Sequence, residues 1–242
     1  MPPRLHVSEA LRANTTLALP EAAARHAQVL RLQPGSEVTL FDGRGGEWAA
    51  RIEAMGKREV TATALLHQAI ERELPCRVTL ALAMPSGERM DFVVEKATEL
   101  GAARIVPLTS ERSVLRLSGE RADKRRAHWQ AIAVAACEQC GRNRVPEVQA
   151  PQPLAAWLGT LGEGTASEQR WLLGWRDAQP WSAASASSVI TLSGPEGGFT
   201  ADEEALAASR GFVTVALGAR VLRADTAPLA AMAALSLHTV TR

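Results

Sequence analysis

The chain has 242 residues, a formal net charge of +1 and 46% hydrophobic residues, which is enough for one large or two modest cores. No apolar run approaches the ~20 residues that cross a bilayer, and the N-terminal residues lack the basic-then-apolar layout of a secretory signal. Three cysteines are too few for a disulfide framework in a chain of this length. A membrane protein, a disulfide scaffold and a disordered chain are therefore excluded, and we expect a cytoplasmic globular protein.

Residues 1–72 predict a small β-rich domain. Apolar and polar residues alternate in three short segments, and glycines separate these segments. Strands are expected at residues 37–42, 47–53 and 59–64, and a helix at residues 21–30. Short strands with tight turns favour a small barrel. The charged segment 71–75 ends in proline and predicts a linker.

The remaining residues, 73–242, predict a second domain in which strands alternate with helices. Strands are expected at residues 78–84, 104–109, 171–174, 188–192 and 212–217. Helices are expected at residues 86–100, 119–140, 202–210 and 228–240, with exposed loops at 159–167 and 182–188. Alternation of this length favours an α/β domain with a parallel sheet.

A glycine-rich segment, Ser193-Gly-Pro-Glu-Gly-Gly-Phe-Thr200, follows one of these apolar strands directly. Thr200 and Glu203 have the spacing of a capping box, so a helix is expected to begin where the glycines end. A strand, a glycine turn and a helix N-terminus together can surround a ligand with backbone N–H groups. The spacing alone slightly favours an ordinary tight connection between the strand and the helix over a ligand-binding loop. The segment matches neither the phosphate-binding loop of nucleoside triphosphatases nor the Rossmann fingerprint.

A second loop, residues 217–226, follows the last predicted strand. Arg220 and Arg223 flank two apolar residues, and Asp225 or Thr226 can cap the helix that follows. Ligands of open α/β sheets bind at the carboxyl ends of the strands, so the two loops are expected to form one pocket. A pair of arginines is commonly solvated surface, but its place beside a glycine favours contact with an anion or RNA.

Cys137 and Cys140 spell C-x-x-C, yet they lie at the end of a predicted Ala-rich helix and lack a second cysteine pair. The histidines are scattered, so neither a redox pair nor a metal site is expected. The polar segment 141–144 that follows favours a surface for a polyanion or a partner subunit. The chain also lacks a nucleophile elbow, a zinc-protease motif and kinase signatures.

Three blocks of sequence together carry a resemblance. They are Met90–Gly101 with Pro107–Ser113, Ala136–Pro146, and Gly194–Gly198 with Leu217–Arg223. In this order and spacing they resemble the RsmE family, the 16S ribosomal RNA uridine-N3 methyltransferases of the SPOUT class. Val29–Leu32 and Phe41–Gly43 resemble the N-terminal domain of that family, so the likeness covers nearly the whole chain.

The resemblance implies an RNA-binding PUA-like β-barrel over residues 1–72 and a SPOUT domain with a deep trefoil knot over residues 73–242. Such knots are rare exceptions to the rule against threaded connections. It also implies S-adenosylmethionine as cofactor, a homodimer, and 16S rRNA, within the assembled small ribosomal subunit, as substrate. The cofactor contacts it implies are Gly194, Glu196, Gly197 and Gly198 in one loop and Leu217, Gly218, Val221 and Leu222 in the other. Leu173 and Gly174 are further candidates at a strand end.

The reaction so implied is an in-line displacement in which uracil N3 attacks the sulfonium methyl group. We expect Arg223, with Arg220, to stabilise negative charge on the uracil or its phosphate, and Glu196 or Asp225 to accept the proton. Contacts with RNA phosphates are expected from Arg31, Lys96, Arg112, Arg142 and Arg144.

The sequence departs from the family pattern in two places. Ala224-Asp-Thr-Ala227 stands where the family usually has Thr-Glu-Thr-Ala, and Pro228 follows it. Gly174-Trp175-Arg176 stands where a His and a Pro are common, which affects contacts on the adenine side. Two other functions stay open: another SPOUT methyltransferase, acting on tRNA or a ribose hydroxyl, and a non-catalytic RNA-binding factor of ribosome assembly.

Overall fold

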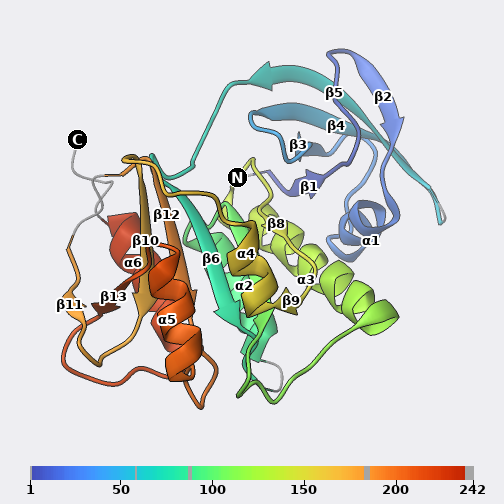
Figure 1. Ribbon diagram of the computed structural model, residues 1–242. Helices are drawn as coiled ribbons and strands as arrows, with labels where there is room; N and C mark the ends of the chain where they lie inside the picture. Colours follow the sequence, from blue (N-terminus) through green and yellow to red (C-terminus); the bar gives the residue numbers. More distant parts are fainter. Residues whose placement is uncertain (1, 58, 87–88, 183–185, 238–242) are drawn as a thin grey trace. The chain divides into compact units, whose positions relative to one another are not determined.

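The computed structural model describes residues 2–57, 59–86, 89–182 and 186–237 (Figure 1). The chain folds as two compact units. The first unit comprises the residues up to Glu73 together with Val134–Val145, and the second comprises Leu74–Ala133 with the residues from Pro146 onward. The boundary expected between residues 72 and 73 stays a prediction, because the first unit also takes a segment from the middle of the chain.

The first unit is built on a five-stranded sheet with the order β1-β3-β4-β5-β2. Its strands are β1 (Arg4–His6), β2 (Thr15–Ala18), β3 (Glu37–Phe41), β4 (Glu47–Met55) and β5 (Val60–Gln68). The β1 and β3 strands pair in parallel, and the other pairs are antiparallel. The helix α1 (Glu21–Val29) begins and ends within a residue of its predicted range.

One apolar cluster stabilises this unit. Alternate residues of the strands point into it, as Val38, Leu40 and Ile52 do, and α1 adds its alanines from the side. The three predicted strands are therefore confirmed, although β4 and β5 run longer than expected. The β1 and β2 strands were not predicted, because segments of three and four residues are too short to show alternation.

The second unit is built on a parallel sheet with the order β11-β13-β10-β12-β6-β7-β8, and β9 also pairs with β7. Its main strands are β6 (Arg77–Ala83), β7 (Arg104–Thr109), β10 (Glu168–Leu173), β12 (Ser188–Ser193) and β13 (Val213–Ala216). Three two-residue strands complete it: β8 (Glu147–Val148), β9 (Gln152–Pro153) and β11 (Gln179–Pro180). The predicted α/β class with a parallel sheet is confirmed.

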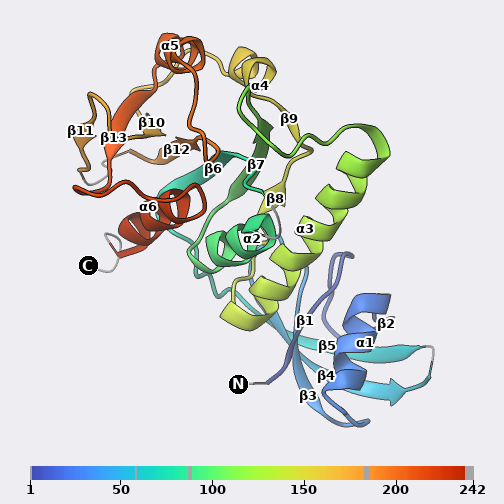
Figure 2. The ribbon, with the colours of Figure 1, turned by 90° about the horizontal axis from the view of Figure 1, so that it is seen from below.

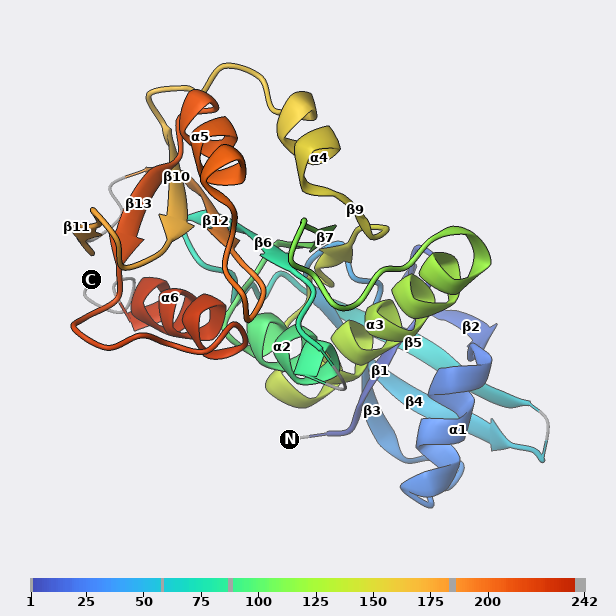
Figure 3. The ribbon, with the colours of Figure 1, turned by 60° about the horizontal axis from the view of Figure 1, so that its bottom comes forward.

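Helices cover both faces of this sheet (Figures 2 and 3). The helices of this unit are α2 (Arg89–Glu99), α4 (Leu154–Thr160), α5 (Ala201–Ser209) and α6 (Thr226–Leu237), together with the part of α3 (Gly119–Cys140) that precedes Val134. The α4 and α5 helices lie on one face, while α2 and α6 contact each other on the opposite face. Leu108, Leu172 and Leu192 point toward α4 and α5, where Trp157 and Phe212 complete the core.

The predicted helices agree with the structure apart from their ends. The α3 helix has the predicted bounds, whereas α2 is assigned from Arg89, and residues 87–88 of its predicted range lie outside the described residues. The α6 helix begins at Thr226, earlier than expected, and residues 238–240 again lie outside the described part. The α4 helix, seven residues long, was not predicted.

The order of the parallel strands positions the site. Because neighbouring parallel strands end at the same edge, the segments after β10, β12 and β13 emerge side by side. The trefoil knot expected in this unit stays a prediction. Among the described residues, none of the helices combines the length and the apolar character that crossing a membrane requires.

Candidate functional site

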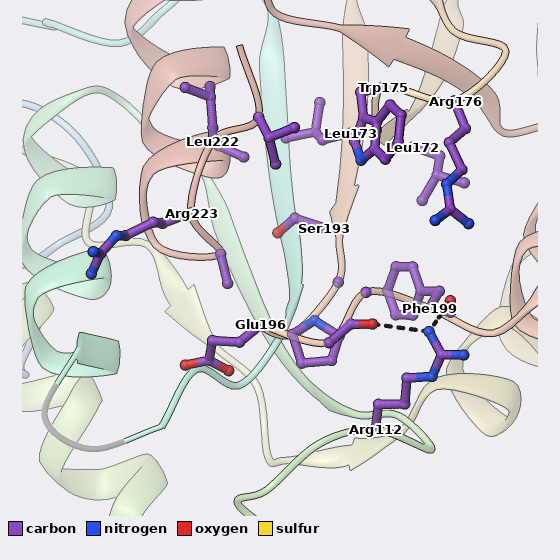
Figure 4. A pocket seen from close by; sticks show the side chains of 18 of the residues that line it. Arg112, Leu172, Leu173, Trp175, Arg176, Ser193, Glu196, Phe199, Leu222 and Arg223 are labelled. Carbon is purple, nitrogen blue, oxygen red and sulfur yellow. Dashed lines mark hydrogen bonds between the residues drawn. The ribbon is translucent and has the colours of Figure 1, made fainter.

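A pocket of about 620 Å³ opens in the second unit where β10, β12 and β13 end (Figure 4). Residues 194–198 were expected to converge with residues 217–223, and both loops contribute to the wall, the second through residues 221–223 and not through 217–220. The third part of the wall follows β10. The wall residues at these three strand ends are Leu172–Arg176, Ser193–Phe199 and Val221–Ala224.

The glycine turn has a backbone that side chains would disturb. Gly198 has a φ of +68°, and its N–H donates to the carbonyl of Pro195 at 2.8 Å, which closes the turn. A Cβ on Gly194 would lie 3.2 Å from the backbone nitrogen of Phe199. The predicted capping box then begins α5: Thr200 Oγ1 accepts from the N–H of Glu203, whose carboxylate accepts from the N–H of Thr200.

Three donors converge on one oxygen of Glu196. The backbone N–H of Ser86 donates to Oε1 at 3.1 Å, the Ser86 hydroxyl at 2.8 Å and Arg89 Nη1 at 3.3 Å. Burial alone would raise the pKa of Glu196, but hydrogen bonds from its own backbone and from Ser86, with the charge of Arg89, lower it below the ordinary value. Glu196 is therefore an ionised anchor that ties the glycine turn to the segment after β6.

Arg89 joins the two loops of the site. Its Nη1 donates to Glu196, and its Nε lies 3.9 Å from Oδ2 of Asp225. Sequence reasoning missed Arg89, because a charged residue near a helix start usually faces water. The strand order carries the missing signal: β6 pairs with β12, so residues that follow β6 meet the glycine turn that follows β12.

The guanidinium groups of Arg220 and Arg223, the two arginines of the second loop, carry no hydrogen bond or ion pair to any residue that the structure describes, although the backbone carbonyl of Arg223 accepts from the N–H groups of Thr226 and Ala227. Arg223 is exposed and lines the large pocket. Arg220 is also exposed, but it lines a smaller adjoining cavity of about 80 Å³. Figure 4 shows Arg223 on the same side of the pocket as Glu196, with Trp175 and Arg176 on the other side.

The other expected cofactor contacts divide between these cavities. Leu173, Gly174, Val221 and Leu222 line both the large pocket and the small cavity. Leu217 and Gly218 line the small cavity but not the large pocket, although Gly218 has the φ of +91° that a glycine at this turn permits. A ligand in the large pocket would therefore meet the later residues of this loop first.

Ser193 is a wall residue that sequence reasoning did not select. Its side chain is 2% exposed, and its hydroxyl has no hydrogen-bond partner among the described residues. Buried hydroxyls are normally paired, so an unpaired one in a pocket wall points to a ligand. Phe199 and Leu172 give the wall an apolar surface. Trp175, which is 59% exposed, stands at the rim with the Arg176 guanidinium 5.0 Å from its ring.

Two of the expected phosphate contacts lie in the second unit, and both are engaged in other interactions. Arg112 donates to backbone carbonyls of the glycine turn. Lys96 lies 2.6 Å from Glu95 and 2.8 Å from Glu99, and hydrogen bonds with these carboxylates raise its pKa above the ordinary value. A lysine held by two carboxylates gives a locally negative group, which does not favour phosphate binding.

The other three expected phosphate contacts, Arg31, Arg142 and Arg144, lie in the first unit. Arg142 is 3% exposed and forms a bidentate ion pair with Glu73, an arrangement that does not favour contact with RNA phosphates. Arg144 pairs with Glu71 at 3.1 Å but keeps half of its side chain exposed. Arg31 is exposed, with a φ of +54°. The segment expected to be a linker is thus fastened within the first unit by its glutamates.

The cysteines show no arrangement for redox or metal chemistry in the described part of the chain. Cys137 is fully buried, and burial raises the pKa of its thiol to about 12. Cys140 is half-buried, and neither residue is in a disulfide. No group of three or more His, Cys, Asp or Glu side chains capable of holding a metal was found among the residues described.

Family models match both parts of the chain. Residues 72–236 match an RNA methyltransferase domain, and residues 19–65 match an RNA methyltransferase PUA domain. The first match alone covers more than half of the sequence.

Individual relatives agree with these matches. The chain is 31% identical to the ribosomal RNA small subunit methyltransferase E of Bacillus subtilis, over 87% of this chain and 85% of that protein. The crystal structure of the enzyme of that name from Neisseria gonorrhoeae, bound to S-adenosyl methionine, is 40% identical and superposes with a TM-score of 0.89, covering 97% and 96% of the two chains. A methyltransferase from Legionella pneumophila in complex with the same cofactor is 33% identical, with a TM-score of 0.92 over 98% of both chains.

Proposed function

The chain belongs to the ribosomal RNA small subunit methyltransferase E family, and from this premise we propose that it methylates N3 of a uridine in 16S rRNA. It is an S-adenosylmethionine-dependent rRNA methyltransferase with an N-terminal PUA-like domain. One observation supports this most directly: both sequence loops and the unpaired Ser193 hydroxyl border the same pocket.

The residues of the pocket fit the proposed cofactor. A large flexible ligand with an aromatic base at one end and a charged amino-acid group at the other needs an apolar wall with a few polar groups. Leu172, Phe199 and Leu222 supply the apolar wall, while the Ser193 hydroxyl and the glycine turn supply polar groups. When bound, S-adenosylmethionine supplies an electrophilic methyl group on a positively charged sulfur.

Arg223 is the proposed electrostatic catalyst. It lines the pocket, and no described carboxylate neutralises it, so its charge is available to the substrate. A fixed cation near the uracil stabilises the negative charge that develops as N3 loses its proton. Arg220, on the adjoining cavity, is proposed to assist by contacting the nucleotide's phosphate.

Asp225 is the better of the two proposed proton acceptors. Glu196 is held by three donors on one oxygen, and its lowered pKa makes it a weak base. Asp225 Oδ2 lies 3.9 Å from Arg89 Nε, and Asp225 Oδ1 accepts a hydrogen bond from the Thr226 hydroxyl at 3.3 Å. We therefore assign proton transfer, directly or through one water, to Asp225 and loop positioning to Glu196.

The substrate, the assembly and the knot are proposals that follow from the family. The PUA-like domain is proposed to bind 16S rRNA in the assembled small ribosomal subunit, with Arg31 and Arg144 among its phosphate contacts. A homodimer, a trefoil knot around the cofactor loops and a cytoplasmic location complete the proposal. Leu217, Gly218 and Gly174 stay candidates for cofactor contact.

Nucleoside analysis tests the proposed reaction. Small ribosomal subunits lacking the modification are incubated with the enzyme and labelled S-adenosylmethionine, digested, and examined by mass spectrometry. The expected product is 3-methyluridine. A ribose-methylated nucleoside, methylation of tRNA only, or binding of RNA without any transfer would each overturn the assignment in a different way.

A further inference from the structure

The segment Pro107–Ser113 is part of the sequence resemblance, but the proposed chemistry gives it no role. It contains the end of β7, and the residues after that strand form a tight turn: the Ser110 N–H donates to Ser113 Oγ at 2.9 Å, and the two hydroxyls lie 2.9 Å apart. Both serines are buried. This turn is therefore rigid, and it presents the residue between its ends, Arg112, in a fixed direction.

A second set of contacts fastens this segment to the helix after the glycine turn. The N–H of Glu111 donates to Oε1 of Glu203 at 2.8 Å. The other oxygen of Glu203 accepts from the N–H of Thr200 in the capping box. One carboxylate thus holds the start of α5 and the segment after β7 together.

Arg112 then reaches the glycine turn itself. Its Nη1 donates to the carbonyl of Gly197 at 2.9 Å and to the carbonyl of Phe199 at 3.3 Å, as the dashed lines in Figure 4 show. An Nη1 nitrogen has two hydrogens, so the two carbonyls use both of them. A Cβ on Gly197 would lie 3.3 Å from the Cβ of Arg112, so glycine permits this close approach.

We propose that Arg112 is a positioning residue of the cofactor pocket: it holds the 194–199 turn in its ligand-binding conformation, and it is not an RNA phosphate contact. The inference rests on the proposed function, because it assumes that the turn binds S-adenosylmethionine. Arg112 lines the pocket beside the turn, and because each peptide unit is planar, fixing the carbonyls of Gly197 and Phe199 fixes the peptide planes of the turn that also lines the pocket. Binding then requires less ordering of the turn.

Calorimetry with S-adenosylmethionine on Arg112→Ala, Arg112→Lys and Gly197→Ala tests this proposal. Loss of hydrogen bonds from a charged donor predicts affinity about tenfold to a hundredfold weaker for Arg112→Ala. Lysine can still donate to a carbonyl, so Arg112→Lys should recover part of the loss. Gly197→Ala should weaken binding too, because its methyl group displaces Arg112. Hydrogen exchange without ligand should quicken at residues 196–200 in both alanine variants.

The matched control is Arg121→Ala, which removes one exposed positive charge from α3. It should keep the cofactor affinity of the wild type. The slope of RNA affinity against salt concentration should be unchanged by Arg112→Ala, whereas a phosphate contact would lower it by about one. Wild-type cofactor affinity in Arg112→Ala, or a lowered salt slope, overturns the inference. Failure of the wild-type protein to bind the cofactor would instead overturn the proposed function.

Discussion

The polar clusters of the two units differ in how far their groups are paired. In the first unit Glu47 accepts from Arg4 at 2.7 Å and from Arg72 at 2.9 Å, and Arg4 also donates to Asn143 at 2.5 Å, so that only its Nε lacks a partner among the described residues. In the second unit, the Ser193 hydroxyl and the Arg223 guanidinium lack such partners among the residues described.

The paired groups of the first unit stabilise the fold, whereas the unpaired groups of the second unit are available to a ligand. Buried charges that satisfy one another stabilise a single conformation and leave little for a ligand to bind. A pocket that leaves a buried hydroxyl unpaired has a cost in stability that a ligand can recover, whereas the exposed Arg223 guanidinium is solvated and its charge stays available to a ligand. The paired cluster should therefore respond to mutation through unfolding, and the unpaired groups through binding and turnover.

The largest effect is expected from Glu47→Ala. It leaves Arg4, whose side chain is 3% exposed, without its carboxylate, and breaking a buried pair costs about 3–5 kcal/mol of unfolding free energy. Urea denaturation measures this loss. The matched control is Glu21→Ala, which breaks an exposed pair with Arg25 and should cost less than about 0.5 kcal/mol. Equal losses in both variants would contradict the contrast between the two units.

Arg223→Ala should act on catalysis alone. Removing a charge that stabilises the transition state should lower kcat by about 10²–10³-fold, with the free energy of unfolding unchanged. Cofactor affinity should stay within about twofold of wild type, measured by calorimetry. Unchanged turnover would show that Arg223 has no role in the reaction.

Acid should weaken the paired cluster. Burial would raise the pKa of Glu47, but hydrogen bonds from Arg72, Arg4 and Asn143 lower it from 4.5 to about 2. Because the folded pKa is the lower one, this stabilisation is complete above pH 4.5 and is lost as the pH falls toward 2, by about 3 kcal/mol in all. Unfolding free energies measured between pH 6 and pH 2.5 should fall less steeply in Glu47→Gln than in wild type. Parallel curves would count against the cluster's role.

Asp225→Asn and Glu196→Gln should have different effects. Loss of a general base lowers kcat by about 10²-fold or more, so Asp225→Asn should reduce kcat by that factor. Glu196→Gln weakens the bonds to Ser86 and Arg89 and should raise the KM for S-adenosylmethionine more than it lowers kcat. If Glu196→Gln instead lowers kcat and Asp225→Asn mainly raises the KM, the role of proton acceptor belongs to Glu196.

The smallest effect is expected from Ser193→Ala. Removing an unpaired buried hydroxyl should leave stability unchanged or slightly higher, while cofactor affinity falls by about 1 kcal/mol, or fivefold. Thr191→Val is the control, since the Thr191 hydroxyl is also buried and unpaired but does not line the pocket. Its stability should rise without any change in affinity. If both variants bind equally well, the Ser193 hydroxyl does not contact the ligand.

Much of the second unit could be predicted from local patterns. The alternation of strands with helices identified the sheet class, and Thr200 with Glu203 identified the start of α5, because these signals lie within a few residues of one another. In the first unit, by contrast, the β1 and β2 strands are too short to show an alternation of apolar and polar residues. Sequence reasoning also found both loops of the pocket.

Sequence reasoning could not find the residues that hold the two pocket loops in place. Arg89 and Glu196 are 107 positions apart in the sequence, and Arg112 and Gly197 are 85 apart, so no spacing rule connects them. The same limit explains Arg142, whose basic neighbourhood suggested an RNA surface. Arg142 is buried in an ion pair with Glu73, and Glu73 lies in a segment whose composition predicted a linker.

The composition of the first unit limits how this protein can be divided. Glu138, in the last turns of α3, accepts from the backbone of His6 at 2.9 Å and contacts His26 at 2.8 Å, and the carbonyl of Arg142 accepts from Arg4. A gene fragment that stops after residue 72 would encode the N-terminal sheet without these contacts. The first unit is consequently not an interchangeable module. Grafting it onto another enzyme would require the acceptor to supply an equivalent of residues 134–145.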